Sequence, residues 1–211
     1  QLLDNLLAWA RGWTDSSKSE GRSWILGDML HSRPLVLNYG ARGSHTATDP
    51  DIRIVVGTNA GFLHMFDNAN GQESWAFFPK ELAPVLDKRR DNAADGDTVY
   101  GVDSPPVYYV KDINNDGTID STVGDKLYVY FGLRRGGKAY YALDVSNPDS
   151  PAFLWKLDKN TTGLGELGQS WSVPVVTFVP GYNASGVPKP VLIFGAGYDT
   201  AKDSKTAVAG A

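Results

Sequence analysis

The pattern Ser-x-Pro followed by apolar residues occurs three times in this chain, as Ser32-Arg33-Pro34-Leu35-Val36, Ser104-Pro105-Pro106-Val107-Tyr108 and Ser172-Val173-Pro174-Val175-Val176. The prolines of successive copies lie 72 and 68 residues apart. Self-similarity at a nearly fixed period indicates a repeated supersecondary unit. Short runs rich in β-branched and aromatic residues, separated by Gly, Asn, Asp and Pro, further indicate that each unit is built of β-strands.

Other landmarks follow each copy in the same order. A run ending in glycine comes next in all three, and the first two copies continue with a run ending in aspartate and a run centred on tryptophan. These runs are 52–57, 127–132 and 191–195, then 62–67 and 139–144, then 74–77 around Trp75 and 154–157 around Trp155. The order predicts four antiparallel strands per unit, with a bulky aromatic side chain in the last strand.

Four-stranded units that stack on one another are typical of a β-propeller. We therefore predict an all-β chain of propeller blades over residues 24–211, with units at about 31–80 and 103–160 and a partial unit at 171–211. A closed propeller needs at least about four blades, so the prediction is a fragment or a partial, modified propeller. A β-sandwich with accidental self-similarity is the alternative fold.

The first 23 residues are predicted to form a helix and a linker. Apolar residues recur at three-to-four spacing, which places them on one helix face, and Gly12 is a plausible end of the helix. The residues on this face are Leu2, Leu3, Leu6, Leu7 and Ala10. The chain opens without an initiator Met, and we expect it to be a piece of a longer protein.

The composition excludes several classes of protein. The formal net charge of −4 argues against nucleic-acid binding, which requires a basic face. The absence of cysteine excludes disulfides, thiolate metal sites and cysteine nucleophiles. No apolar run approaches the roughly 20 residues that span a bilayer, so no membrane insertion by this segment is expected.

The strongest chemical signal is the segment from Asp112 to Asp120, which reads Asp-Ile-Asn-Asn-Asp-Gly-Thr-Ile-Asp. Oxygen-bearing side chains fall at loop positions 1, 3, 5 and 9, glycine falls at position 6, and position 7 offers a main-chain carbonyl, as in an EF-hand loop. The sequence therefore predicts a Ca²⁺ site with the ligands Asp112, Asn114, Asp116, Thr118 (carbonyl) and Asp120. The bidentate Glu of position 12 is replaced by Val123, and strands rather than helices flank the loop. An Asx-rich turn without metal is the alternative.

Other polar patterns in the sequence give weaker evidence for a functional site. The acidic residues Asp91, Asp95, Asp97 and Asp103 lack the alternating spacing of a calcium loop and are interpreted as a solvated loop. The glycines of 163–168 match G-x-G-x-x-G, but a strand with a proline follows them instead of a helix, so a dinucleotide site is rejected. No nucleophile–base arrangement is recognisable, and we predict that the chain is not an enzyme and has no catalytic residues.

Three segments together resemble a known family. They are 25–34 (Ile-Leu-Gly-Asp-Met-Leu-His-Ser-Arg-Pro), 56–67 (Val-Gly-Thr-Asn-Ala-Gly-Phe-Leu-His-Met-Phe-Asp) and 168–174 (Gly-Gln-Ser-Trp-Ser-Val-Pro). They resemble the C-terminal propeller domain of the PilY (also PilC) family of type IV pilus tip proteins, and the resemblance extends over nearly the whole chain.

The resemblance implies a modified seven-bladed propeller whose EF-hand-like loop binds calcium and couples calcium occupancy to pilus extension and retraction. It implies a pilus biogenesis factor and tip-associated adhesin, with pilus components, including minor pilins at the pilus tip, and a host-cell receptor as partners. It also implies a place at the bacterial cell surface or pilus tip, reached through the periplasm and outer membrane. Some members bind integrins through Arg-Gly-Asp, but the nearest tripeptide here is Arg42-Gly43-Ser44, which lacks the aspartate.

Two other functions remain open from the sequence. Quinoprotein dehydrogenases share long propeller blades with glycine, aspartate and tryptophan landmarks, although many use a vicinal disulfide that this chain cannot form. A carbohydrate-binding propeller is the third hypothesis, because aromatic residues make up 11% of the chain.

Overall fold

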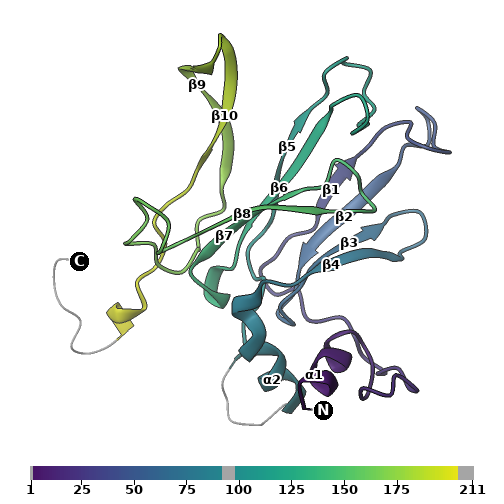
Figure 1. The fold of residues 1–211 in the computed structure, drawn as a ribbon, viewed down its shortest axis with the longest axis vertical. Helices are drawn as coiled ribbons and strands as arrows, with labels where there is room; N and C mark the ends of the chain where they lie inside the picture. The colour runs from purple at the N-terminus through teal and green to yellow at the C-terminus, as the bar shows by residue number, and fades with distance from the viewer. Residues whose placement is uncertain (1, 92–97, 204–211) are drawn as a thin grey trace.

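The computed structural model describes residues 2–91 and 98–203. Over these residues the chain is mostly β, with two four-stranded antiparallel sheets, one two-stranded sheet and short helices (Figure 1). The predicted four-stranded antiparallel sheets are therefore present.

The first sheet contains strands β1 (Leu35–Asn38), β2 (Ile52–Gly57), β3 (Leu63–Asp67) and β4 (Glu73–Phe77), ordered as they occur in the chain. The second contains β5 (Val107–Lys111), β6 (Lys126–Gly132), β7 (Ala139–Asp144) and β8 (Ala152–Asp158) in the same meander order. The third contains β9 (Val175–Ala184) and β10 (Val187–Ile193), and this hairpin stands beside β5 in Figure 1.

The two four-stranded sheets share a register shift at the same place, in addition to the same strand order. The register between β3 and β4 shifts just after the pair Met65–Trp75, and that between β7 and β8 shifts just after Ala142–Trp155. Each shift inserts one extra residue immediately before the tryptophan, as a β-bulge does. The tryptophans thus occupy equivalent positions in equivalent strands.

The core lies between these two sheets. Leu37, Val55 and Met65 of the first sheet belong to one buried cluster with Val129 and Leu143 of the second. Aromatic rings join the sheets at one side, where Phe77 meets Phe131 and Tyr141 with ring centroids 6.1 and 5.8 Å apart. Neither sheet could bury its inner face alone, so each supplies the other's partner surface.

A glycine ends the second strand of each four-stranded sheet because another segment approaches there. A Cβ on Gly57 would lie 2.2 Å from the carbonyl oxygen of Val102, and one on Gly132 would lie 2.9 Å from that of Ser170. Val102 and Ser170 each stand two residues before the serine of the next Ser-x-Pro copy. The glycine landmark therefore reflects the close approach of the following repeat.

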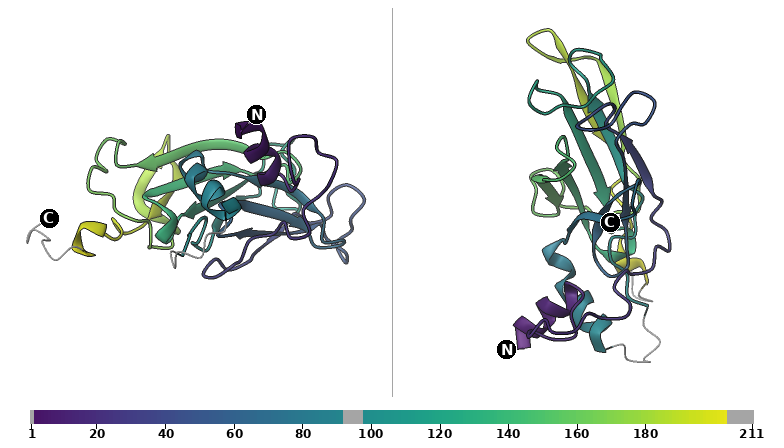
Figure 2. Two further views of the ribbon diagram at one scale, coloured as in Figure 1. Left: turned by 90° about the horizontal axis from the view of Figure 1, so that it is seen from below. Right: turned by 90° about the vertical axis from the view of Figure 1, so that its right-hand side faces the viewer.

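Helices gather at one end of the molecule. The predicted N-terminal helix is present as α1 (Leu2–Ala10), and Gly12 follows it with φ of 92°. It lies against α2 (Ala83–Asp91), as Figure 2 shows. Three short 3₁₀ helices, η1 (Lys80–Leu82), η2 (Arg134–Gly136) and η3 (Thr200–Asp203), complete the described elements. No helix in the described ranges has the length and apolar character needed to cross a membrane.

The helix α2 was not predicted. Its sequence, Ala-Pro-Val-Leu-Asp-Lys-Arg-Arg-Asp, has few apolar residues to mark a helical face. Leu86 and, just before the helix, Leu82 are nevertheless buried. The helix is held by tertiary packing of these leucines and by a proline in its first turn, where the missing N–H costs nothing.

Candidate functional site

The predicted calcium segment connects two neighbouring antiparallel strands. β5 ends at Lys111 and β6 begins at Lys126, and these two residues are the last pair of the ladder. The segment 112–125 is therefore the loop of a hairpin, as its flanks predicted. The ladder holds the two ends of the loop together, which brings the predicted ligand residues into one short, closed stretch.

The first predicted ligand organises the turn. The carboxylate of Asp112 accepts hydrogen bonds from the main-chain N–H of Asn115 at 2.7 Å and of Gly117 at 2.8 Å. Gly117 has φ of 77° and Asn115 has φ of 57°, values that glycine and asparagine tolerate best. Both carboxylate oxygens of Asp112 therefore face the inside of the turn.

The next two predicted ligands continue the inward pattern. The side-chain oxygen of Asn114 accepts the N–H of Asp116 at 3.3 Å, and the carboxylate of Asp116 accepts the N–H of Thr118 at 2.8 Å. The amide nitrogen of Asn114 also donates to the other oxygen of Asp116 at 2.8 Å. Neighbouring side chains at alternating positions are thus within hydrogen-bond distance of each other.

Asp120 is turned toward Thr122 instead. Its Oδ1 accepts the main-chain N–H and the hydroxyl of Thr122, both at 2.8 Å. These hydrogen bonds hold the pKa of Asp120 below its ordinary value, so the carboxylate is ionised over the neutral range. Among the described residues, no three acidic or histidine side chains converge tightly enough to form a metal cluster.

The donor set nevertheless suits a hard cation. Asp112, Asn114, Asp116 and Asp120 offer carboxylate and amide oxygens, and Thr118 offers a carbonyl, with no nitrogen or sulfur ligand among them. Each of these four side chains already accepts a main-chain N–H of the loop. Completing a shell would require Asp120 to leave Thr122 and Asn114 to release Asp116.

Sequence reasoning missed Asp125. This side chain is fully buried, and its two oxygens accept the N–H of Ile113 at 2.8 Å and of Asp120 at 3.0 Å. It thereby ties the first and last parts of the calcium segment together. Its position after Gly124 and before β6 gave one signal, a turn residue, but no pattern distinguished it from the exposed aspartates.

The loop rests on the first sheet. The N–H of buried Ile119 donates to the carbonyl of Tyr39 at 2.9 Å, and the Tyr39 hydroxyl donates to the carbonyl of Val145 at 2.6 Å. Burial raises the pKa of the Tyr39 phenol well above its usual value, which keeps it a neutral donor. One tyrosine therefore joins the loop, the first sheet and the end of β7.

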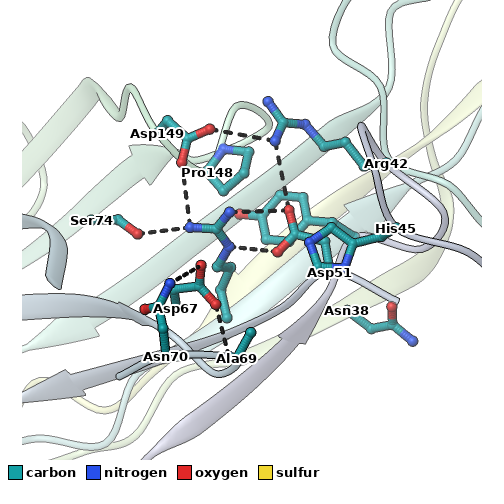
Figure 3. A network of polar contacts seen from close by, with 12 residues as sticks. Asn38, Arg42, His45, Asp51, Asp67, Ala69, Asn70, Ser74, Pro148 and Asp149 are labelled. Carbon is teal, nitrogen blue, oxygen red and sulfur yellow. Dashed lines mark hydrogen bonds and ion pairs between the residues drawn. The ribbon is translucent and has the colours of Figure 1, made fainter. Parts of the chain in front are cut away.

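The main-chain N–H of Tyr39 donates to the carbonyl of Asp51 at 2.9 Å, and the side chain of Asp51 belongs to a network of ion pairs (Figure 3). Arg53 binds the buried carboxylate of Asp51 through two nitrogens, at 2.5 and 3.2 Å, and reaches Asp149 at 3.3 Å. Arg42 contacts the same Asp149 at 3.4 Å and Asp51 at 3.6 Å. Because Asp149 follows β7, the network bridges the two sheets, and its Arg42 belongs to the Arg42-Gly43-Ser44 tripeptide.

The sequence pattern of a second acidic group, which includes Asp103, indicates a solvated loop, and this interpretation does not hold for Asp103. The Asp103 side chain is fully buried and contacts His31 Nδ1 at 2.9 Å and Arg134 at 3.3 Å. The interpretation was wrong here because both partners of Asp103, His31 and Arg134, are distant from it in sequence. Asp91 ends α2, and Asp95 and Asp97 lie outside the described residues.

No model of a protein family matches the chain. Among curated proteins, it is 31% identical over 173 residues to the type IV pilus biogenesis factor PilY1 homolog of Xylella fastidiosa, an alignment that covers 74% of this chain. It is also 31% identical over 185 residues, 79% of this chain, to PilY1 of Pseudomonas aeruginosa strain UCBPP-PA14. This chain is a homologue of the type IV pilus biogenesis factor PilY1. The predicted resemblance is confirmed.

The similarity concerns a small part of each PilY1 protein. The chain spans 13% of the Xylella protein and 15% of the Pseudomonas one. Among solved structures, the crystal structure of the Pseudomonas aeruginosa PilY1 C-terminal domain matches 72% of this chain and 26% of that one, at 28% identity and a TM-score of 0.49.

Proposed function

We propose that this chain is a calcium-binding segment of a type IV pilus biogenesis factor of the PilY1 kind, and that it is not an enzyme. The homology to PilY1 carries the pilus assignment. In this proposal the segment acts at the bacterial surface or pilus tip, with minor pilins and a host-cell receptor as partners. Calcium occupancy regulates pilus extension and retraction.

The calcium part of the proposal is supported by the loop between β5 and β6. Asp112, Asn114 and Asp116 are oriented by the N–H groups of the loop itself, and of these three only Asn114 has to release a neighbouring ligand, Asp116, to present its oxygen. Asp112, Asp116 and Asp120 place three carboxylates within nine residues. A bound Ca²⁺ would convert their mutual repulsion into attraction and stiffen the hairpin.

We further propose that the two four-stranded sheets are consecutive blades of a propeller and that β9 and β10 begin a third. The shared strand order, the bulge before Trp75 and Trp155, and the glycines ending β2 and β6 support this interpretation. Integrin binding through an Arg-Gly-Asp-type motif is not part of the proposal, since Ser44 replaces the aspartate and Arg42 is engaged with Asp149 and Asp51.

Calorimetric titration with CaCl₂ tests the site. We expect a dissociation constant between roughly micromolar and sub-millimolar, because three charges are present but the bidentate position-12 Glu is absent. Mg²⁺ should compete poorly, since it resists dehydration and demands a tighter octahedron. Asp120→Ala should abolish the calcium heat while the protein stays folded, and Asp87→Ala, on the exposed surface of α2, is the matched control.

A second experiment tests the role in pilus regulation separately from calcium binding. Asp120→Ala introduced into the full-length gene should change pilus number or retraction while the protein is still made. Equal calcium heats for wild type and Asp120→Ala would eliminate the loop as the site. Normal pili in a strain that has lost calcium binding would eliminate the regulatory role, and a quinone absorbance with dehydrogenase turnover would favour the enzyme alternative.

A further inference from the structure

A hollow lined by aromatic and polar side chains lies away from the calcium loop. It measures about 640 Å³ and is lined by Tyr100, Arg135, Gln169, Trp171, Tyr198 and Asp203. We call these residues, without Asp203, the Trp171 cradle. Its volume is within the range of small-molecule sites, and its members come from segments far apart in the chain.

Arg135 is the centre of the Trp171 cradle. Its guanidinium carbon lies 5.3 Å from the ring centroid of Tyr100 and 5.2 Å from that of Trp171. One of its nitrogens donates to the Tyr100 hydroxyl at 3.2 Å, and the residue is exposed. Within the described residues no carboxylate forms an ion pair with it. The guanidinium is therefore held in place while most of its five N–H donors stay available.

The neighbouring arginine, Arg134, differs from Arg135 in having a carboxylate partner. Arg134 lies over Trp171 at 4.3 Å, but its charge is matched by the buried carboxylate of Asp103. The indole N–H of Trp171 donates to Gln169 at 3.0 Å, and Gln169 in turn donates to the carbonyl of Arg135 at 3.2 Å. These contacts fix the tryptophan ring and leave Arg135 as the unmatched charge.

We propose that the Trp171 cradle binds an acidic sugar residue, a hexuronic or sialic acid. The planar fork of Arg135 suits a carboxylate, which it can bind through two parallel hydrogen bonds. The rings of Trp171 and Tyr198, 6.1 Å apart and inclined by 57°, present electron-rich faces to the C–H groups of a pyranose. The proposal does not depend on calcium or on the pilus assignment.

Asp203 shapes the expected binding mode. It lines the same hollow, and its carboxylate accepts a hydrogen bond from the Tyr198 hydroxyl. A ligand carboxylate would be repelled there, so it should lie on the Arg135 side with the neutral part of the ring toward Tyr198. Replacing Asp203 with asparagine should therefore strengthen binding of an acidic sugar and leave a neutral sugar unaffected.

Tryptophan fluorescence titration of the whole chain with glucuronic acid, N-acetylneuraminic acid and glucose tests the proposal. Glucuronic acid differs from glucose by its carboxylate and should bind about tenfold more tightly, which corresponds to about 1.4 kcal/mol for charged hydrogen bonds. Arg135→Gln should remove this preference. Arg90→Gln, a surface arginine of α2, should retain it, and so should Asp120→Ala.

Four outcomes would overturn the proposal. One is an equal response to glucuronic acid and glucose. Another is an acid preference that survives Arg135→Gln. The third is binding of a peptide with a free C-terminal carboxylate while both acidic sugars fail to bind. Loss of sugar binding in Asp120→Ala would show that the signal comes from the calcium loop instead.

Discussion

At the scale of single residues, Asp125 is the side chain that closes the predicted calcium segment, residues 112–125. It is fully buried and accepts two main-chain N–H groups, of Ile113 and Asp120. Asp125→Ala should lower the free energy of unfolding by about 2–3 kcal/mol, because two main-chain N–H donors lose their carboxyl acceptor. Urea unfolding measures this loss.

The same variant should also weaken calcium binding, although Asp125 is not a predicted ligand. Asp87→Ala is again the control and should change stability by less than about 0.5 kcal/mol. If Asp125→Ala unfolds at the wild-type urea concentration and binds calcium normally, Asp125 does not organise the loop.

At the scale of elements, the connection between β1 and β2 rests against the calcium segment at one glycine. Gly40 has φ of 74°, and a Cβ there would lie 2.2 Å from the carbonyl oxygen of Gly117. Gly43, in the same connection, has φ of 62° but no atom within 4 Å of its Cβ position. A substitution at Gly43 therefore tests backbone strain alone, whereas a substitution at Gly40 tests backbone strain together with the contact to Gly117.

Gly43→Ala should cost about 1–2 kcal/mol, the strain of a left-handed alanine, and leave calcium binding unchanged. Gly40→Ala should cost more and weaken calcium binding several-fold, because the added methyl displaces Gly117. Urea unfolding and calorimetry on both variants provide the comparison. Equal effects of the two substitutions would mean that the contact between the connection and the calcium segment is unimportant.

At the scale of the whole molecule, the two four-stranded sheets share one core and should unfold together. Trp75 packs against that core and donates its indole N–H to the carbonyl of Pro148, beyond β7, at 2.9 Å. Trp155 is also half-buried, but it stacks on Tyr130 of its own sheet, with ring centroids 5.7 Å apart. Trp75 therefore contacts the neighbouring sheet's connection after β7, whereas Trp155 packs on a strand of its own sheet.

Trp75→Ala should therefore cost about 3 kcal/mol or more, and Trp155→Ala less. Circular dichroism and fluorescence should report the same unfolding midpoint in each variant, since one core is lost at once. A larger loss from Trp155→Ala, or separate transitions for the two sheets, would contradict a core shared between equivalent units.

Much of the fold follows from local pattern. Strand runs alternate with Gly, Pro and Asx residues, and these turn residues punctuate the chain wherever it folds. The helix of 2–10, the glycine after it and the order of landmarks in the repeats could therefore be predicted. The calcium segment could be proposed for the same reason, because its ligand spacing is a local property and its hairpin depends on adjacent strands.

Other features depend on residues distant in the chain. Asp103 is buried because His31 and Arg134 reach it, and Arg53 lies in an ion-pair network because Asp149 arrives from the other sheet. The helix α2 has too little apolar periodicity to be recognised and is held by the burial of Leu82 and Leu86. Burial and charge pairing depend on which residues lie nearby in three dimensions, so no local sequence pattern encodes them.

The same distinction separates Trp75 from Trp155 and Arg135 from Arg134. Strand period and turn chemistry are short-range, and they specify which elements form and in what order. The two tryptophans have the same place in the repeat, yet only the packing of sheet on sheet gives Trp75 its partner at Pro148. The two arginines are adjacent in sequence, yet Asp103 neutralises one and leaves the other open to a ligand, because side chains of neighbouring residues point into different surroundings.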